Sequence, residues 1–214
     1  MATTGVSGRI TKPEAPLRIF AFSVVNTLSW LPFAIALLLG GCGHASVRWS
    51  EEVQLTSGER IFTERTARGN TFSQLGGSSG WGRDVEMTVA ISNTATDIKT
   101  PPEWRSPYAP VLLDYESDSG AWVIIATFNY CEGWHELGRP MPPYIQFRSI
   151  NGGAWEALPV QPQYLHRQTN LLAKPKTRGE PNLVTSEQKE LRQRRAGERF
   201  QRILSHWGQV NPCS

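Results

Sequence analysis

The sequence predicts a mainly β fold, an antiparallel sandwich or open barrel, with one C-terminal amphipathic helix packed on it. Three observations lead to this prediction. Apolar and polar residues alternate with a period of two in several stretches between residues 47 and 160. Residues typical of turns separate these stretches, and beyond residue 184 the period becomes that of a helix. About seven short strands separated by turns are typical of sandwiches and open barrels.

The first predicted hairpin joins residues 47–55 to residues 60–66. Val47, Trp49 and Val53 fall on one parity, and polar residues fall on the other, as in a strand that is half buried. Gly58 separates the two strands. The next segment, 68–81, is rich in Gly and Ser and has no periodicity, so it is expected to be a flexible loop.

The remaining strands follow at short intervals. Residues 85–91 alternate again, and the prolines between 101 and 110 indicate an extended connection. Residues 121–128 form another expected strand, and within it Val123 to Ala126 are apolar on both parities, which is typical of a central strand. Together with this strand, the sequence predicts strands at residues 111–115, 144–150 and 154–160.

The C-terminal part changes in character. Residues 165–184 contain Pro, Lys and Gly, and we expect them to form a linker. We expect residues 185–208 to form a helix. Thr185 and Gln188 fit a capping box at its start. One face carries an apolar stripe, which we expect to pack on the sheet: Ala196, Phe200, Ile203, Leu204 and Trp207. Residues 209–214 are left as a tail.

The charges of the chain are unevenly distributed. The net charge is only +3, which argues against a nucleic-acid partner. Residues 165–214 hold ten basic and four acidic side chains, whereas residues 43–164 hold nine and 14. Arg194, Arg195 and Arg199 are therefore candidates for contact with anionic lipid or lipopolysaccharide. The interpretation that we favour over such contact is a solvated basic helix face that lies against an acidic body.

The N-terminal region carries the most specific motif. An uncharged apolar run, 19–39, follows three basic residues and ends in Leu39-Gly40-Gly41-Cys42. These features resemble the signal peptide and lipobox of bacterial lipoproteins. The resemblance implies that residues 1–41 are a signal peptide and that Cys42 accepts lipid, including palmitate. It also implies that residues 42–46 tether a β-rich body, 47–164, outside the cytoplasm. Gly43 after the cysteine favours the outer membrane over the inner membrane.

An uncleaved membrane anchor is the alternative for this region. The run is 21 residues long, and about 20 apolar residues can span a bilayer. Pro32 argues against a permanent helix there, because it removes a backbone hydrogen bond and kinks the chain.

The resemblance also bears on the other cysteines. If Cys42 carries lipid, Cys131 and Cys213 are left as one pair in an oxidising compartment. We expect them to form a disulfide; the alternative is two free thiols.

Two further features are candidates for chemistry or binding. Residues 131–136 combine a thiol, an imidazole and two carboxylates, but they form no recognised metal or nucleophile motif. Trp81, Trp104 and Trp134 fall in predicted loops, where exposed rings could stack on sugars. The sequence thus indicates no catalytic residue, no metal ligand and no cofactor.

We therefore expect a membrane-tethered, periplasm-facing envelope lipoprotein that acts as a non-enzymatic binding or structural module. Its expected partners are the bilayer and an envelope protein or anionic lipid. The alternative is an envelope hydrolase or glycan-binding module that uses residues 131–136 and the loop tryptophans.

Overall fold

The structure is a computed structural model, and it describes residues 43–73, 79–92, 98–175, 179–207 and 213. Side chains are described for these residues except those of 72–84. The chain divides into two units between Gly40 and Gly41, and every described residue belongs to the second. The predicted signal peptide, 1–41, and the predicted lipid acceptor Cys42 lie outside the described residues.

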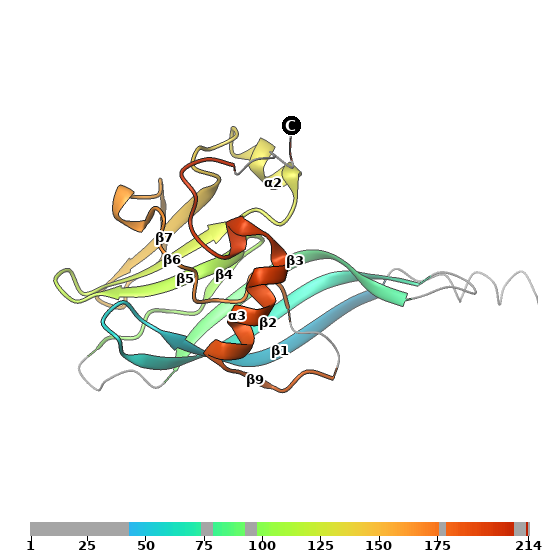
Figure 1. Ribbon diagram of the computed structural model, residues 1–214, viewed down its shortest axis with the longest axis horizontal. Helices are drawn as coiled ribbons and strands as arrows, with labels where there is room; N and C mark the ends of the chain where they lie inside the picture. Colours follow the sequence, from blue (N-terminus) through green and yellow to red (C-terminus); the bar gives the residue numbers. More distant parts are fainter. Residues whose placement is uncertain (1–42, 74–78, 93–97, 176–178, 208–212, 214) are drawn as a thin grey trace, which may run out of the picture. The chain divides into compact units, whose positions relative to one another are not determined.

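The described part is built on two β-sheets (Figure 1). The first has the strand order β4-β3-β2-β1-β9, and β9 is the one strand in it that runs parallel to its neighbour. Its strands are β1 (Gly43–Gln54), β2 (Arg60–Ser73), β3 (Ser79–Ser92), β4 (Trp104–Ser106) and β9 (Leu183–Val184). The second sheet is antiparallel, and its strands lie side by side in the order in which they follow in the chain. They are β5 (Ala109–Glu116), β6 (Ala121–Thr127), β7 (Tyr144–Ile150) and β8 (Glu156–Leu158).

The two sheets pack on one apolar core and one main helix lies near the C-terminus, which confirms the predicted mainly β fold. Strand β6 is buried along its whole length, as expected for the central strand of its sheet. Trp104 of the first sheet contacts Phe147 of the second edge to face, with ring centroids 5.2 Å apart. This aromatic pair therefore joins the two layers.

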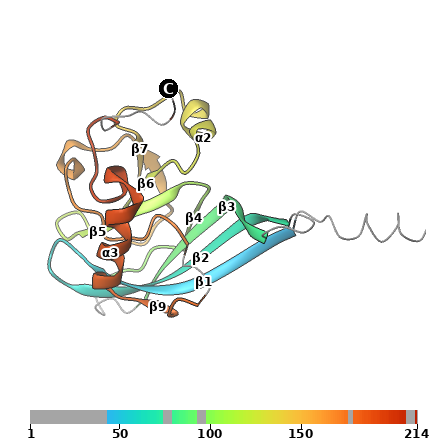
Figure 2. The same cartoon turned by 45° about the vertical axis from the view of Figure 1, so that its right-hand side comes forward.

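Strands β1, β2 and β3 are longer than predicted. Gly43 already pairs with Thr71, so β1 begins inside the predicted tether 42–46. Thr71 pairs in turn with Trp81, so much of the predicted loop 68–81 is strand. Backbone pairing overrides the low strand propensity of glycine here, because both neighbours satisfy the peptide groups of β2. Figures 1 and 2 show these three strands running on beyond the rest of the sheets.

Helix α3 (Ser186–Ala196) is shorter than the predicted helix 185–208. Its start is as predicted, because Thr185 and Gln188 form a capping box. It ends because Gly197 adopts φ 104°, which no helix allows, and a 3₁₀ turn (Glu198–Phe200) follows. Phe200, Ile203, Leu204 and Trp207 are buried as predicted, but none of them lies on α3.

The predicted linker, 165–184, is packed against the body instead. Leu171, Leu172 and Ala173 are buried in the core, and Leu183–Val184 form strand β9. The short 3₁₀ helix η2 (Pro162–Tyr164) precedes this segment and buries Tyr164. Burial of the apolar run Leu171-Leu172-Ala173 stabilises this packed position more than the loop-forming residues around it disfavour it. No helix among the described residues has the length and apolar character needed to cross a membrane.

Candidate functional site

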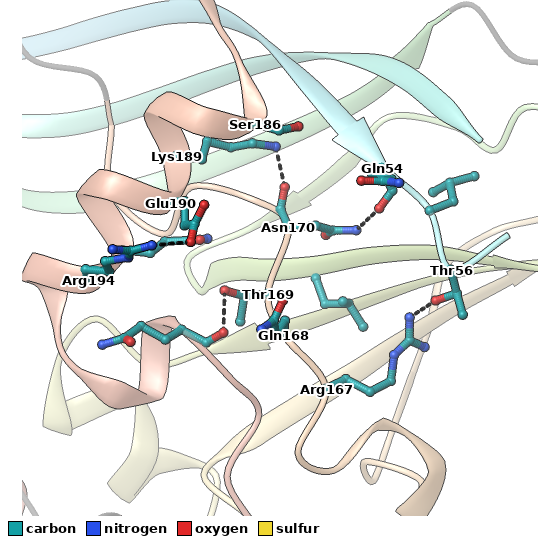
Figure 3. Close-up of a pocket in the computed structure, with 14 residues that line it drawn as sticks. Gln54, Thr56, Arg167, Gln168, Thr169, Asn170, Ser186, Lys189, Glu190 and Arg194 are labelled. Carbon is teal, nitrogen blue, oxygen red and sulfur yellow. Dashed lines mark hydrogen bonds and ion pairs between the residues drawn. The ribbon is translucent and has the colours of Figure 1, made fainter. Parts of the chain in front are cut away.

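A groove of about 630 Å³ lies between α3, residues 167–170 and the end of β1 (Figure 3). We call it the polar groove, because 12 of its 14 lining residues are polar or charged. The lining comprises Gln54, Leu55, Thr56, Leu112, Arg167, Gln168, Thr169, Asn170, Ser186, Lys189, Glu190, Gln193, Arg194 and Gln201.

One face of α3 forms one wall of the polar groove. Ser186, Lys189, Gln193 and their neighbours recur every three or four residues, so their side chains share one side of the helix. This helix packs through polar groups: Lys189 and Gln193 are buried, whereas Leu191, its one large apolar side chain, is exposed. Gln193 Nε2 donates to the carbonyl of Leu171 at 3.0 Å, which fixes the helix to the segment beneath it.

The opposite wall is the extended segment 167–170. Gln168 forms an isolated antiparallel bridge with Arg202. Thr169 N donates to the carbonyl of Gln201 at 2.9 Å, and Ile203 N donates to the carbonyl of Arg167 at 2.9 Å. These bonds hold the wall in place without using the side chain of Gln168.

Beneath α3 lies a group of three buried charges, Glu51, Arg65 and Lys189, which we call the buried charge cluster. Arg65 Nη1 lies 2.9 Å from Glu51 Oε1, and neither side chain is reached by solvent. The same guanidinium donates to the carbonyls of Thr88 and Leu172. Burial lowers the pKa of Arg65, although the carboxylate of Glu51 acts to raise it.

Lys189 connects this cluster to the polar groove. Its ammonium donates to the carbonyls of Glu52 and Asn170 and lies 3.9 Å from Glu51 Oε2. Burial lowers the pKa of Lys189, and the nearby carboxylate of Glu51 opposes that shift. The cluster thus sets one carboxylate against two cations, one of which lines the groove.

Several lining side chains are already engaged. Arg167 pairs with Asp114 at 2.8 Å, and Asn170 Oδ1 accepts from Leu113 N at 2.8 Å. Four other lining residues have unused hydrogen-bonding capacity: Gln54, Gln168, Ser186 and Gln201. Their side-chain polar atoms have no hydrogen-bond partner within the described part of the chain. The arrangement can therefore bind a polar ligand through amides, a hydroxyl and a buried ammonium.

The comparisons with protein families, curated proteins and solved structures found no match. The assignment of a site therefore depends on the geometry of this chain alone. Within the described ranges, no group of three or more His, Cys, Asp or Glu side chains is arranged to hold a metal ion.

The predicted disulfide between Cys131 and Cys213 is confirmed, with Cα atoms 5.1 Å apart. Cys131 begins a short helix, α2 (Cys131–Glu136), where a polar loop was expected. Trp134 of this helix packs on Trp207 with ring centroids 5.5 Å apart, and Phe128 completes this small apolar cluster. The bridge and the cluster together hold the C-terminal segment against α2.

The expected exposure of the loop tryptophans is wrong for two of the three. Trp104 is 1% exposed and lies in β4, because its ring fills the core between the sheets. Trp134 is 6% exposed, because the C-terminal segment covers it. Trp81 belongs to β3 rather than to a loop, and its side chain lies outside the described set.

The three candidate arginines do not form one free basic surface. Arg194 pairs with Glu190 one turn earlier on α3 and lines the polar groove. Arg199 lies beyond the helix and stacks on the rings of Phe200 and Trp207, 4.6 and 5.5 Å from their centroids. Arg195 is the exposed member for which no pairing within the described part of the chain is found.

The groove residues were not predicted from the sequence. Gln54, Gln168 and Gln201 come from three separate segments, and nothing in their spacing indicates that they meet. The nearest available signal was the spacing of two polar residues on α3: Lys189 and Gln193 lie four residues apart, on the side of the helix opposite Leu191.

Proposed function

We propose that this chain is an exported lipoprotein of the bacterial envelope, anchored through Cys42, whose folded part binds a polar ligand in the polar groove. The observation that carries the binding role is the set of unused polar side chains around a cavity of about 630 Å³. Cavities of this size are typical of sites for small molecules. Amides that lack a protein partner are suited to exchange water for a ligand.

The anchor is supported by the order of features along the chain. The apolar run ends in Leu39-Gly40-Gly41-Cys42, and Gly43 is already part of β1. Acyl chains on Cys42 would therefore hold this end of the first sheet at the bilayer with no spacer between them. Two or more acyl chains are sufficient for lasting anchorage. Gly43 favours the outer membrane as the destination.

A binding module is favoured over the alternative of a hydrolase or glycan-binding module built on residues 131–136. The sulfur of Cys131 is bonded to Cys213 and cannot act as a nucleophile in that state. Trp104 and Trp134, which were to stack on sugars, are core residues. The proposal therefore assigns recognition to the polar groove.

Membrane contact is assigned to Cys42 rather than to the arginines near α3. Arg194 is neutralised by Glu190, and Arg199 is occupied by two aromatic rings. A solvated helix face, the interpretation favoured for this region, agrees with these contacts.

Metabolic labelling tests the anchor. The full chain and its Cys42→Ser variant are expressed in a bacterial host that is fed an alkyne analogue of palmitate. We expect label on the parent chain, a mature product that begins at residue 42, and neither of these for Cys42→Ser. Ser46→Ala is the control and should be labelled like the parent. Equal labelling or equal processing of Cys42→Ser would refute the anchor.

A further inference from the structure

We infer that the polar groove binds an anionic group, a carboxylate or a phosphate, carried by a small hydroxylated molecule, and that Lys189 is the residue that meets the anion. This inference rests on the proposed binding role of the groove but is independent of the lipid anchor. It follows from the charge balance beneath α3, from the geometry of Lys189 and from the chemistry of the walls.

The charge balance beneath the groove is incomplete. Glu51 is the one carboxylate of the buried charge cluster, and its two oxygens are already used. Oε1 accepts from Trp49 Nε1 at 2.6 Å and from Arg65 at 2.9 Å, while Oε2 accepts from Leu172 N at 3.0 Å. The carboxylate is thus hydrogen-bonded to Arg65, and the second cation shares the same carboxylate from a longer distance.

Lys189 is that second cation. An ammonium has three donors, and two of them reach the carbonyls of Glu52 and Asn170. The distance of 3.9 Å to Glu51 Oε2 is too long for a hydrogen bond. Lys189 is only 3% exposed, yet it lines the groove (Figure 3). Two buried cations that share one carboxylate leave one positive charge in excess, which is costly, so an anion in the groove would supply the missing charge and the missing acceptor.

The other charges of the walls do not cancel this excess. The lining holds three cations, Arg167, Lys189 and Arg194, and one carboxylate, Glu190. Glu190 is paired with Arg194, and Arg167 is paired with Asp114 behind the wall. Lys189 remains as the cation that an incoming anion can neutralise.

The rest of the ligand is defined by the neutral polar side chains. Gln54, Gln168 and Gln201 each offer an amide donor and an amide acceptor, and Ser186 offers a hydroxyl. No aromatic ring is among the residues that line this cavity in the described structure. Recognition by hydrogen bonds rather than by stacking suits a polyhydroxylated acid.

The first test compares gluconate with sorbitol, which have similar hydroxylated chains and differ in the carboxylate. Binding to the purified full chain is measured by calorimetry, and inorganic phosphate is added as a competitor. We expect gluconate to bind about tenfold or more tightly than sorbitol, since a hydrogen bond to a charged group contributes that much. We also expect phosphate to displace it. Equal affinity for the two polyols, or no binding of gluconate and phosphate, would overturn the inference.

Variants locate the anion. Lys189→Met should abolish the preference for gluconate, but this residue also fixes α3, so its loss could disturb the fold. Gln168→Glu avoids that problem, because Gln168 is exposed and its side chain has no partner among the described residues. The added carboxylate should weaken gluconate binding about tenfold, and by clearly more than it weakens any binding of sorbitol, because sorbitol carries no charge for the carboxylate to repel.

Gln188→Glu is the matched control, since it adds the same charge outside the groove and a capping box accepts either residue. Unchanged gluconate affinity in Gln168→Glu would contradict the assignment, as would equal weakening in Gln188→Glu. The result is separate from the labelling of Cys42. A labelled chain that does not bind gluconate keeps its anchor and loses the anion site.

Discussion

The carboxylate of Glu51 and the guanidinium of Arg65 form an ion pair at 2.9 Å in a position that solvent does not reach. The pair joins neighbouring strands, and Arg65 also bonds to the carbonyl of Leu172 in the segment that crosses them. Trp49 completes the arrangement, since Arg65 lies 5.1 Å from its ring centroid. One buried carboxylate thus connects β1, β2 and the segment beneath α3, and its removal has a predictable cost.

Glu51→Gln should lower the free energy of unfolding by about 3 to 5 kcal/mol, because it leaves two buried cations without a carboxylate. Urea denaturation measures this effect. Glu64→Gln, an exposed carboxylate on β2, is the control and should change stability by less than about 1 kcal/mol. The double variant Glu51→Gln/Lys189→Met should lose less than the sum of the two single variants, because it leaves one unpaired cation. Additive losses would show that the two residues are not coupled.

How far the sequence predicts such features depends on the range of the interaction. The alternation of Val47, Trp49 and Val53 predicts β1 because a strand repeats every two residues. The same alternation predicts a buried side at position 51 but cannot show that the carboxylate there meets Arg65. That contact is set by the register of β1 against β2, in which Trp49 pairs with Arg65.

Where the structure differs from the predictions, the causes are likewise long-range contacts. Gly69 predicts a loop by local propensity, whereas pairing with both neighbouring strands makes residues 68–71 part of β2. Trp104 was placed in an exposed connection because of its prolines, and its ring instead fills the gap between the sheets. The polar groove could not be predicted, because its walls come from segments far apart in sequence. Local rules succeeded at Thr185, where the capping box depends on four consecutive residues.

Cys213→Ser should destabilise the protein by up to about 4 to 5 kcal/mol, since the bridge closes a long loop with a sequence separation of 82. The loss should lower the free energy of global unfolding, and α2 should in addition lose local protection, because the bridge at Cys131 no longer holds it. Hydrogen exchange with mass spectrometry measures both the size and the place of the effect. Cys131→Ser provides the matched comparison and should behave in the same way. A thiol at Cys131 that alkylates readily in the unreduced parent chain would contradict the disulfide.

Gly197→Ala should destabilise the protein by about 1 to 3 kcal/mol. Gly197 has φ 104° and ψ 158°, a conformation that is strained for residues with a side chain. The cost comes from the backbone alone, since a Cβ at this position would meet no atom of the described structure within 4 Å. Thermal unfolding measures it, and the exposed neighbour Arg195→Ala is the control. A neutral effect of Gly197→Ala would mean that the end of α3 is not set by this glycine.

Alkaline pH should destabilise the protein through Tyr144. Burial raises the pKa of Tyr144 to about 12, although a backbone bond from Leu204 and the charge of Arg199 act in the opposite direction. The hydroxyl also donates to the carbonyls of Arg199 and Arg202, so it fastens the C-terminal segment to β7. The unfolded chain releases this proton near pH 10, before the folded chain does, so stability is full below pH 10 and falls as the pH rises towards about 12.

Urea denaturation at a series of pH values tests this dependence. Between pH 10 and 12, Tyr144 should lower the free energy of unfolding of the parent chain by about 2 to 3 kcal/mol. The Tyr144→Phe variant should not show this decrease. Burial and the carboxylate of Glu116 also raise the pKa of Tyr164, so Tyr164→Phe should remove a second part. Lys189 changes the stability in the opposite direction. Because burial lowers its pKa in the folded chain, its contribution to the free energy of unfolding rises as the pH increases towards 10.5. The variants must therefore be compared with the parent at the same pH. A Tyr144→Phe chain that loses stability as steeply as the parent would show that this phenol is not the group that titrates.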